Sequence, residues 1–168
     1  ILENHLSASE LIFDSELAGD IDLLVWPENA SDLDPLRDAE AAKKIDELAK
    51  RVGAPFSFGT ITTRGGENFN TTLLWEPGVG AVDFYDKQQP VPFAEFVPDR
   101  EFWRLFAPTL IDMVPEGFSF GTRDGIYEVS DDFTAGTLIC FEIAEDSILR
   151  ELVAGGAEVI LSQTNNAD

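Results

Sequence analysis

The chain of 168 residues is poor in metal-binding and disulfide-forming side chains, with one cysteine, Cys140, and one histidine, His5. A lone cysteine excludes a disulfide within the chain, and one thiol with one imidazole cannot supply a structural zinc site. No loop pattern typical of a hard cation on carboxylates is present either. The sequence therefore predicts no metal and no other cofactor.

Long apolar runs are also missing. The most apolar uncharged stretch near the interior covers residues 133–141, which is far shorter than the roughly 20 residues that a membrane helix requires. The chain begins at Ile1 without a leader-like segment and stops after residues 164–168. We therefore expect an internal part of a longer protein, with no membrane-spanning segment of its own.

Basic residues are scarce as well, with 11 Lys and Arg against 32 Asp and Glu and a net charge of -21. Such a charge repels phosphate backbones, so nucleic acid is excluded as a partner class, and it also opposes an anionic membrane surface. What the chain does have is 44% hydrophobic and 11% aromatic residues. That content is enough for the core of one folded domain.

The hydrophobic periodicity changes along the chain. Helical spacing predicts helices over residues 2–18 and 35–52, the second with Asp34 as N-cap and Gly53 at its end. An apolar run at 21–26 predicts a buried parallel strand, and alternation over 55–85 predicts an antiparallel meander of three strands. A proline-rich ordered loop follows, then a short helix that can carry a lid, and then a βαβ unit after a further strand. Their expected ranges are 100–112 for the helix, 126–129 for the strand, and 134–139, 144–154 and 158–162 for the βαβ unit.

This order of elements favours an α/β sandwich over a helical bundle or an all-β fold. No repeat, low-complexity tract or linker divides the chain, so residues 1–168 are expected to form one domain. Parallel strands of such folds present their carboxyl ends to ligands.

Cys140 stands where the apolar strand at 134–139 gives way to a predicted helix. Its sulfur can point out of the sheet towards the positive end of the helix dipole, which predicts a lowered thiol pKa and more thiolate. A free cysteine is also among the residues most often buried. A small core side chain is therefore the alternative interpretation.

Two charged residues follow other predicted strands. Glu28 comes directly after the first strand and can act as a general base, or can be an ordinary turn residue. Lys87 follows the meander, whereas the other three lysines lie on one predicted helix. A cation there can stabilise the oxyanion formed when a thiolate attacks a carbonyl. The alternative is a surface partner of Asp83 or Asp86.

Two further glutamates belong to the same candidate site. Glu95 has apolar neighbours throughout residues 92–98, so it needs a partner or a shifted pKa, and Lys87 is the obvious partner. A loop glutamate turned to water is the alternative. Glu142, two residues after Cys140, is expected either to cap the following helix or to hold the site together.

The order of Glu28, Lys87 and Cys140, each at the end of a strand, resembles the nitrilase superfamily, which has a Glu-Lys-Cys triad in an α-β-β-α sandwich. Longer sequence motifs narrow the resemblance to the apolipoprotein N-acyltransferase family and extend it over nearly the whole chain. These motifs are VWPEN at 25–29, YDK at 85–87, VPFAEFVP at 91–98, LICFE at 138–142 and TNNA at 164–167.

The resemblance implies a nitrilase-like α-β-β-α sandwich, truncated at both ends, with residues 1–168 as a catalytic carbon-nitrogen hydrolase domain fragment. It implies Glu28 as general base, Lys87 as stabiliser of the tetrahedral intermediate and Cys140 as nucleophile. It also implies Glu95 as a second essential glutamate. Phe141 and Glu142 would be the supporting residues after the nucleophile.

The implied reaction is an N-acyl transfer in two halves. A phospholipid donates a fatty acyl chain to Cys140 as a thioester, and the α-amine of a diacylglyceryl-cysteine apolipoprotein then takes it as an amide. The implied location is the cytoplasmic membrane, with the catalytic domain on the extracytoplasmic face. The membrane contact would come through segments absent from this chain.

Four residues depart from the family's usual pattern. Phe141 replaces Tyr, which removes a hydroxyl but keeps the backbone N–H that can serve an oxyanion. Ala94 and Phe96 replace Gly and Tyr, and Asn166 stands where Asp is frequent.

Two other functions stay open on the sequence. A soluble amidase or carbamoylase with the same triad is the second hypothesis, although such enzymes are not expected to have the segment 87–98 in this form. A non-catalytic domain that keeps the fold is the third, and Phe141 is the only feature that favours it.

Overall fold

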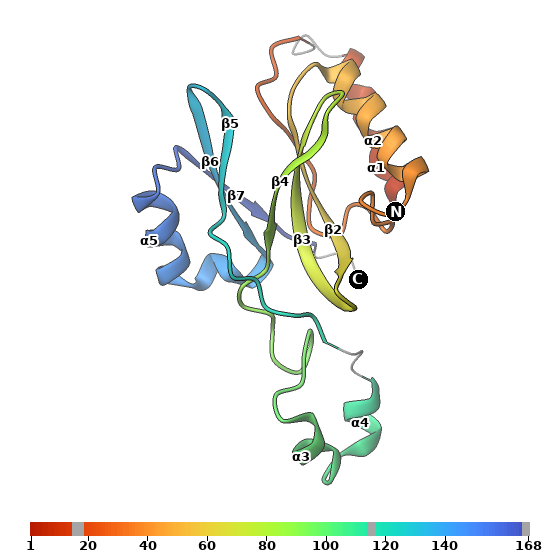
Figure 1. Ribbon diagram of the computed structural model, residues 1–168, viewed down its shortest axis with the longest axis vertical. Helices are drawn as coiled ribbons and strands as arrows, with labels where there is room; N and C mark the ends of the chain where they lie inside the picture. The colour runs from red at the N-terminus through yellow and green to blue at the C-terminus, as the bar shows by residue number, and fades with distance from the viewer. Residues whose placement is uncertain (15–18, 114–116, 166–168) are drawn as a thin grey trace.

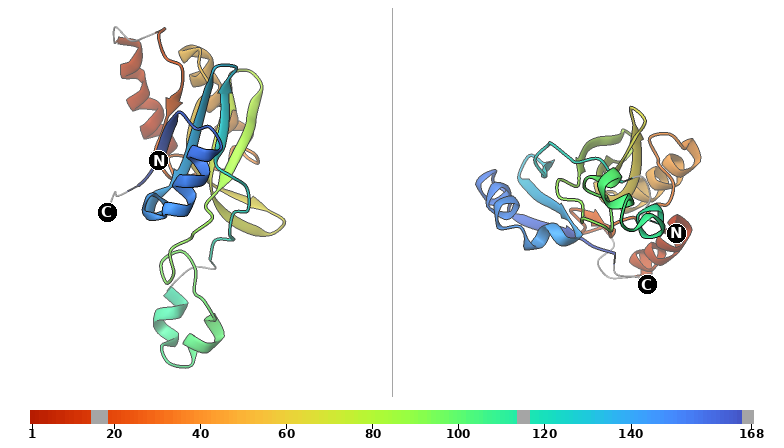
Figure 2. Two further views of the ribbon diagram at one scale, coloured as in Figure 1. Left: turned by 90° about the vertical axis from the view of Figure 1, so that its left-hand side faces the viewer. Right: turned by 90° about the horizontal axis from the view of Figure 1, so that it is seen from below.

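The computed structural model describes residues 1–14, 19–113 and 117–165, and these residues form four layers (Figure 1). Two helices, α1 (Leu2–Ser9) and α2 (Ala39–Val52), cover the outer face of a first sheet. A second sheet lies on its other face and is covered in turn by α5 (Asp146–Ala154), as the view from below shows (Figure 2). The predicted α-β-β-α sandwich is thus confirmed.

The first sheet has the order β1-β2-β3-β4. β2, β3 and β4 form the predicted antiparallel meander, and β1 pairs with β2 in parallel. β1 is shorter than the predicted strand at 21–26, and the chain continues along β2 beyond it, where the carbonyl of Pro27 accepts the N–H of Gly59 at 3.1 Å. The bounds are β1 (Leu24–Val25), β2 (Phe56–Arg64), β3 (Glu67–Glu76) and β4 (Gly80–Asp86).

The start of α2 differs from the prediction. The side chain of Asp38, not Asp34, caps the helix by accepting two backbone N–H groups of the first turn at 2.9 and 3.0 Å. Asp34 Oδ1 accepts the backbone N–H of Leu36 at 2.9 Å, which caps only the turn before the helix, and its Oδ2 accepts the backbone N–H of Thr63 on β2 at 3.2 Å. Gly53 ends the helix in a left-handed conformation, as predicted.

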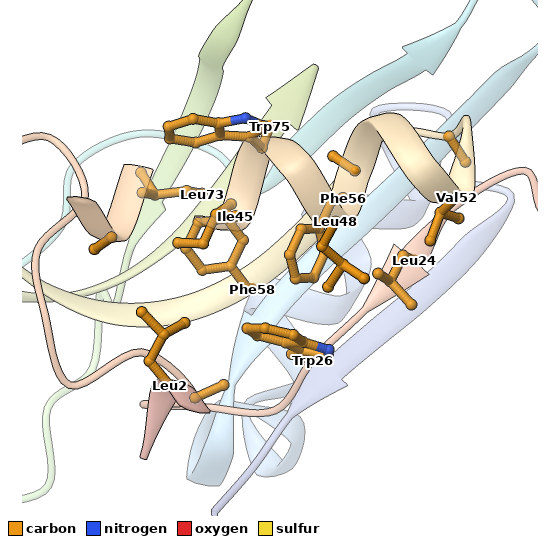
Figure 3. Close-up of a cluster of buried hydrophobic side chains, with 14 residues drawn as sticks. Leu2, Leu24, Trp26, Ile45, Leu48, Val52, Phe56, Phe58, Leu73 and Trp75 are labelled. Atoms are coloured by element: carbon orange, nitrogen blue, oxygen red, sulfur yellow. The ribbon is translucent and has the colours of Figure 1, made fainter. Parts of the chain in front are cut away.

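The first helix is also shorter than expected. α1 ends at Ser9 and continues as a 3₁₀ turn over Glu10–Asp14, and residues 15–18 of the predicted helix lie outside the described residues. Side chains from both helices pack on the sheet around a group of aromatic rings, so the largest core lies between this helix layer and the first sheet (Figure 3). The labelled members are Leu2, Leu24, Trp26, Ile45, Leu48, Val52, Phe56, Phe58, Leu73 and Trp75.

The second sheet has the order β5-β6-β7. β5 (Ile126–Ser130) pairs with β6 (Phe133–Ile139) antiparallel, and β6 pairs with β7 (Val159–Gln163) in parallel, which confirms the predicted βαβ unit. A short 3₁₀ turn, Cys140–Ala144, separates β6 from α5. The predicted helix at 144–154 therefore begins two residues later than expected, at Asp146.

Between β4 and β5 the chain leaves the sandwich as an arm, defined here as residues 88–113 and 117–122. The single helix predicted at 100–112 is two helices, α3 (Arg100–Arg104) and α4 (Pro108–Met113), because Pro108 cannot continue the first one. The arm projects beyond the ends of both sheets (Figure 1). No helix in the described ranges has the length and apolarity needed to cross a bilayer.

Candidate active site

Cys140 is the first residue after β6, in a strained backbone conformation. Its φ of 55° lies in the left-handed region, which residues other than glycine rarely adopt. Such a conformation costs on the order of 1–3 kcal/mol and is typical of functional sites. The side chain is half-buried and packs against the hydrophobic cluster between the two sheets, so it is partly a core side chain but is not sealed from solvent.

The pKa of the Cys140 thiol is raised, chiefly by burial and next by the negative charge of Glu28. Lys87 and the backbone N–H of Phe141 act in the opposite direction and do not outweigh burial. The predicted lowering is therefore wrong. Its cause was to be a helix dipole, but only a short 3₁₀ turn follows the cysteine, and α5 begins at Asp146. The sulfur rests as a thiol and needs a base to become a nucleophile.

Glu28 lies just beyond β1, in a segment packed tightly on β2. A Cβ at Gly59 would come within 2.6 Å of the Glu28 Cα, so only glycine allows this approach. The glutamate is buried and accepts hydrogen bonds from Asn70 Nδ2 at 2.7 Å and from the backbone N–H of Asn165 at 3.1 Å. The alternative of an ordinary turn residue is thereby excluded.

Lys87 directly follows β4 and is 1% exposed. Its Nζ lies 2.7 Å from Glu95 Oε2 and 3.7 Å from Glu28 Oε1. The predicted pairing of Lys87 with Glu95 is confirmed. The surface alternative is wrong, because Asp83 and Asp86 pair with two arginines, Arg123 and Arg64.

Glu95 reaches this cluster from the arm. Its Oε2 also accepts the backbone N–H of Val91 at 2.7 Å, and its Oε1 accepts from Asn70 Nδ2 at 3.1 Å. The alternative of a glutamate turned to water is therefore wrong. Residues 87–95 and the distant segment after β1 thus bring two carboxylates to one ammonium.

Asn70 is the residue of this cluster that the sequence did not single out. It is 1% exposed on β3 and donates to both carboxylates. A signal was present, because alternation along β3 puts Asn70 on the same face as Thr72 and Leu74, which are buried towards the second sheet. An amide on such a face needs polar partners.

Glu142 holds the site together, the second function considered for it, and does not cap α5, whose N-cap Glu145 has no side-chain hydrogen bond. It is fully buried, and its Oε2 accepts the backbone N–H of Ile139 at 2.8 Å, which caps the 3₁₀ turn. Its Oε1 accepts the backbone N–H groups of Gln88 and Gln89 at 2.6 and 3.0 Å, which holds the chain after Lys87 beside the turn that carries Cys140.

Tyr85 completes this support. Its hydroxyl donates to Glu142 Oε2 at 3.0 Å. Burial, and next the charge of Glu142, raise the pKa of Tyr85 above its ordinary range, so the hydroxyl remains a donor. The Phe141 side chain, by contrast, is exposed and joins none of these contacts.

The described residues contain no group of His, Cys, Asp and Glu arranged to hold a metal ion. A hollow of about 630 Å³ lies among Arg64, Phe69, Phe84 and Arg123. By strand alternation it is on the opposite face of the first sheet from Asn70, so it is separate from the cluster. Asn166 and Ala167, which belong to the family motif TNNA at 164–167, lie outside the described residues.

The model of the family described as carbon-nitrogen hydrolase matches residues 1–168. The chain belongs to the carbon-nitrogen hydrolase family. Within it, the chain is 32% identical to an apolipoprotein N-acyltransferase of Mycolicibacterium smegmatis over 99% of its length, and 30% identical to apolipoprotein N-acyltransferase 2 of Treponema denticola over 87%. It spans only 29% and 30% of the length of these two relatives.

Solved structures of carbon-nitrogen hydrolases share the fold. An amidase from Nesterenkonia sp. superposes with a TM-score of 0.68 at 15% identity, over 100% of this chain and 61% of that one. A carbon-nitrogen hydrolase from Helicobacter pylori gives a TM-score of 0.68 at 15% identity, over 96% of this chain and 54% of that one. At such identities the likeness concerns the fold alone.

Proposed function

We propose that this chain is the catalytic domain fragment of an apolipoprotein N-acyltransferase, in which Cys140 carries the acyl group. The observation that carries the proposal is the buried cluster of Lys87 between Glu28 and Glu95, whose charges act on the Cys140 thiol. A half-buried thiol with a raised pKa is a poor nucleophile until a base takes its proton. Glu28 has the charge and the position to be that base.

In the first half-reaction, Glu28 takes the proton of Cys140, and the sulfur attacks the ester carbonyl of a phospholipid. The Lys87 ammonium and the backbone N–H of Phe141 stabilise the oxyanion that forms. When the intermediate collapses, the carbon–oxygen bond breaks and the leaving alcohol, a lysophospholipid, takes the proton from Glu28. The acyl chain remains on Cys140 as a thioester.

In the second half-reaction, the α-amine of a diacylglyceryl-cysteine apolipoprotein attacks the thioester. Glu28 takes a proton from the attacking nitrogen and returns it to the leaving sulfur. The products are the amide and the free thiol. Glu95 holds the ammonium of Lys87 in place through both halves, at 2.7 Å.

The lipid nature of the substrates is supported by two observations. The curated relatives are named apolipoprotein N-acyltransferases. The arm also exposes large apolar side chains that a water-soluble enzyme for small amides does not need: Phe102, Leu105, Phe106 and Leu110 are 53 to 79% exposed. We place the parent protein in the cytoplasmic membrane, with this domain on the extracytoplasmic face and the membrane segments outside this chain.

The proposal is tested with the full-length protein, phospholipid vesicles and a synthetic diacylglyceryl-cysteine peptide. We expect N-acylated peptide, detected by mass spectrometry, and no product with the Cys140→Ala variant. Ammonia release from small amides without lipid, together with no acylated peptide, would instead establish the soluble amidase or carbamoylase. If neither substrate class is turned over, the result would favour the third hypothesis, a non-catalytic domain that keeps the fold.

A further inference from the structure

The side-chain amide of Asn70 contacts both of the glutamates that flank Lys87. Its Nδ2 donates to Glu28 Oε1 at 2.7 Å and to Glu95 Oε1 at 3.1 Å. Its backbone carbonyl accepts the N–H of Lys87 at 2.8 Å, so β3 also fixes where the lysine side chain begins. Both hydrogens of one amide group are thus used on two carboxylates.

The orientation of this amide follows from charge. Asn70 Oδ1 is buried and has no hydrogen-bond partner among the described residues. A flipped amide would place that oxygen against two carboxylate oxygens, which is worse than leaving it unpaired. A buried acceptor without a partner costs on the order of 1–3 kcal/mol, so the two bonds from Nδ2 outweigh that loss.

The charges around Asn70 do not balance. The groups that face its amide are Glu28 from the segment after β1, Lys87 after β4 and Glu95 from the arm, and Cys140 lies near them after β6. Asp86 and Arg64 pair on the opposite face of the sheet, where Thr71 contacts Asp86. One ammonium therefore faces two carboxylates inside the protein. The surplus negative charge needs further donors, and Asn70 supplies one to each glutamate.

We propose that Asn70 is a positioning residue that stabilises both glutamates in their charged form on either side of Lys87, and so keeps Glu28 able to take the Cys140 proton. The role given to Glu28 rests on the proposed function. The hydrogen-bonded bridge from Asn70 to the two carboxylates does not rest on the proposed function. It is tested separately, by the pH dependence of the folding equilibrium constant.

The decisive variant is Asn70→Asp, which keeps the shape of the side chain and replaces the donating nitrogen with an oxygen. Three carboxylates then surround one ammonium, and two of them must share a proton in the folded state. The unfolded chain does not hold that proton near neutral pH. The folding equilibrium constant of the variant therefore falls about tenfold for each unit of rising pH between about pH 6 and 8, measured by urea denaturation at several pH values.

The matched control is Asn68→Asp, the same change two residues earlier on β3 at an exposed position. Its folding equilibrium constant, like that of the unchanged protein, varies little over this pH range. A pH dependence of Asn70→Asp no steeper than that of Asn68→Asp overturns the proposal.

A second variant covers the case in which Asn70→Asp does not fold. When Asn70→Asp is combined with Glu95→Gln, the new amide nitrogen at position 95 takes the place of Oε1 and donates to the new carboxylate at position 70. The amide oxygen at position 95 keeps the contacts of Oε2 with Lys87 and Val91. The charge of the cluster returns to its original value. The carboxylate at position 70 still faces Glu28 Oε1, so we expect the double variant to fold with a weaker pH dependence than Asn70→Asp; a double variant that stays unfolded, or that is as pH-dependent as Asn70→Asp, contradicts the bridge.

The catalytic consequence has its own readout. In Asn70→Asp the acid limb of the pH profile of kcat/KM for acyl transfer moves up by about one pH unit or more, because the shared proton must leave before Glu28 can act. A merely structural role lowers the rate evenly at all pH values. If the unchanged protein transfers no acyl group, the proposed function fails, while the folding measurement still decides the role of Asn70.

Discussion

Lysine occurs in two contrasting places in this protein. Lys43, Lys44 and Lys50 on α2 pair with acidic residues in water, with side chains 37 to 72% exposed. Lys87 pairs with two glutamates at 1% exposure. The contacts are of similar length, 2.6 to 3.7 Å on α2 and 2.7 and 3.7 Å at Lys87. What differs is the surrounding medium, and with it the cost of losing a partner.

In water an unpaired charge is solvated, so an exposed pair contributes little and salt screens it. Inside the protein an unpaired charge is not solvated by water, and removing its partner is strongly destabilising. The buried pair is therefore weak as a source of net stability but effective at holding a base and a cation in fixed positions. That property suits a catalytic site.

The largest effect is expected from Glu28→Gln. The amide keeps the size of the side chain but cannot take the Cys140 proton, so kcat for acyl transfer falls about 10²- to 10⁴-fold. Single-turnover kinetics with phospholipid measure the loss. Glu47→Gln on α2 is the matched change at an exposed ion pair and should leave kcat unchanged. A similar fall in kcat there would contradict the distinction between the exposed pairs on α2 and the cluster around Lys87.

Lys87→Met comes next and acts on stability. One buried and one partly buried carboxylate lose their cation, which we expect to lower the free energy of unfolding by about 3–5 kcal/mol. Lys43→Met, the same substitution at an exposed pair, changes it by no more than about 1 kcal/mol. Urea denaturation compares the two variants. Adding Glu95→Gln to Lys87→Met should recover part of the loss, and no recovery would mean that packing, not charge, determines it.

A smaller effect concerns the thiol itself. Because burial and Glu28 raise the pKa of Cys140, its alkylation by iodoacetamide reaches half of its maximal rate at a pH above that of free cysteine, about 8.5. The fold favours the protonated thiol, so stability is intact below the thiol's ordinary pKa and falls as pH rises through the raised value. Cys140→Ala lacks this fall. An alkylation midpoint below that of free cysteine would refute the assignment of a resting thiol.

The smallest expected effect is a difference in salt dependence between an exposed ion pair on α2 and the ion pair of Lys87 with Glu95. Raising NaCl from low to high concentration weakens the contribution of the Lys43–Glu47 pair, measured by a double-mutant cycle, towards zero. The coupling between Lys87 and Glu95 changes much less, because solvent ions do not reach the pair. Equal salt dependence of the two cycles would show that water enters the site.

Local patterns in the sequence predict much of this architecture. The meander and the βαβ unit follow from hydrophobic periods of strands and helices, and the pairing of Lys87 with Glu95 follows from one carboxylate set among apolar neighbours. Each of these depends on residues close together in the chain or on a strong local mismatch of polarity. The structure retains these locally predicted features because no contact with a distant part of the chain overrides them.

Other features depend on contacts that no local pattern contains. The sequence pattern predicted Asp34 as the cap of α2, whereas Asp34 caps only the preceding turn and also binds the N–H of Thr63 on β2, and Asp38 caps the helix. Asn70 becomes part of the site only when β1, β4 and the arm converge on β3. The thiol pKa depends on burial by the assembled sandwich, and the helix that the sequence placed directly after Cys140 begins only at Asp146.

The central claim is that Cys140 receives the acyl group with help from the buried cluster. Peptide mapping by mass spectrometry, after incubation of the full-length protein with phospholipid and no acceptor, tests it most directly. We predict a hydroxylamine-sensitive acyl adduct on the Cys140 peptide, formed far more slowly in Glu28→Gln. An adduct on another residue, or acyl transfer that continues in Cys140→Ala, would contradict the account.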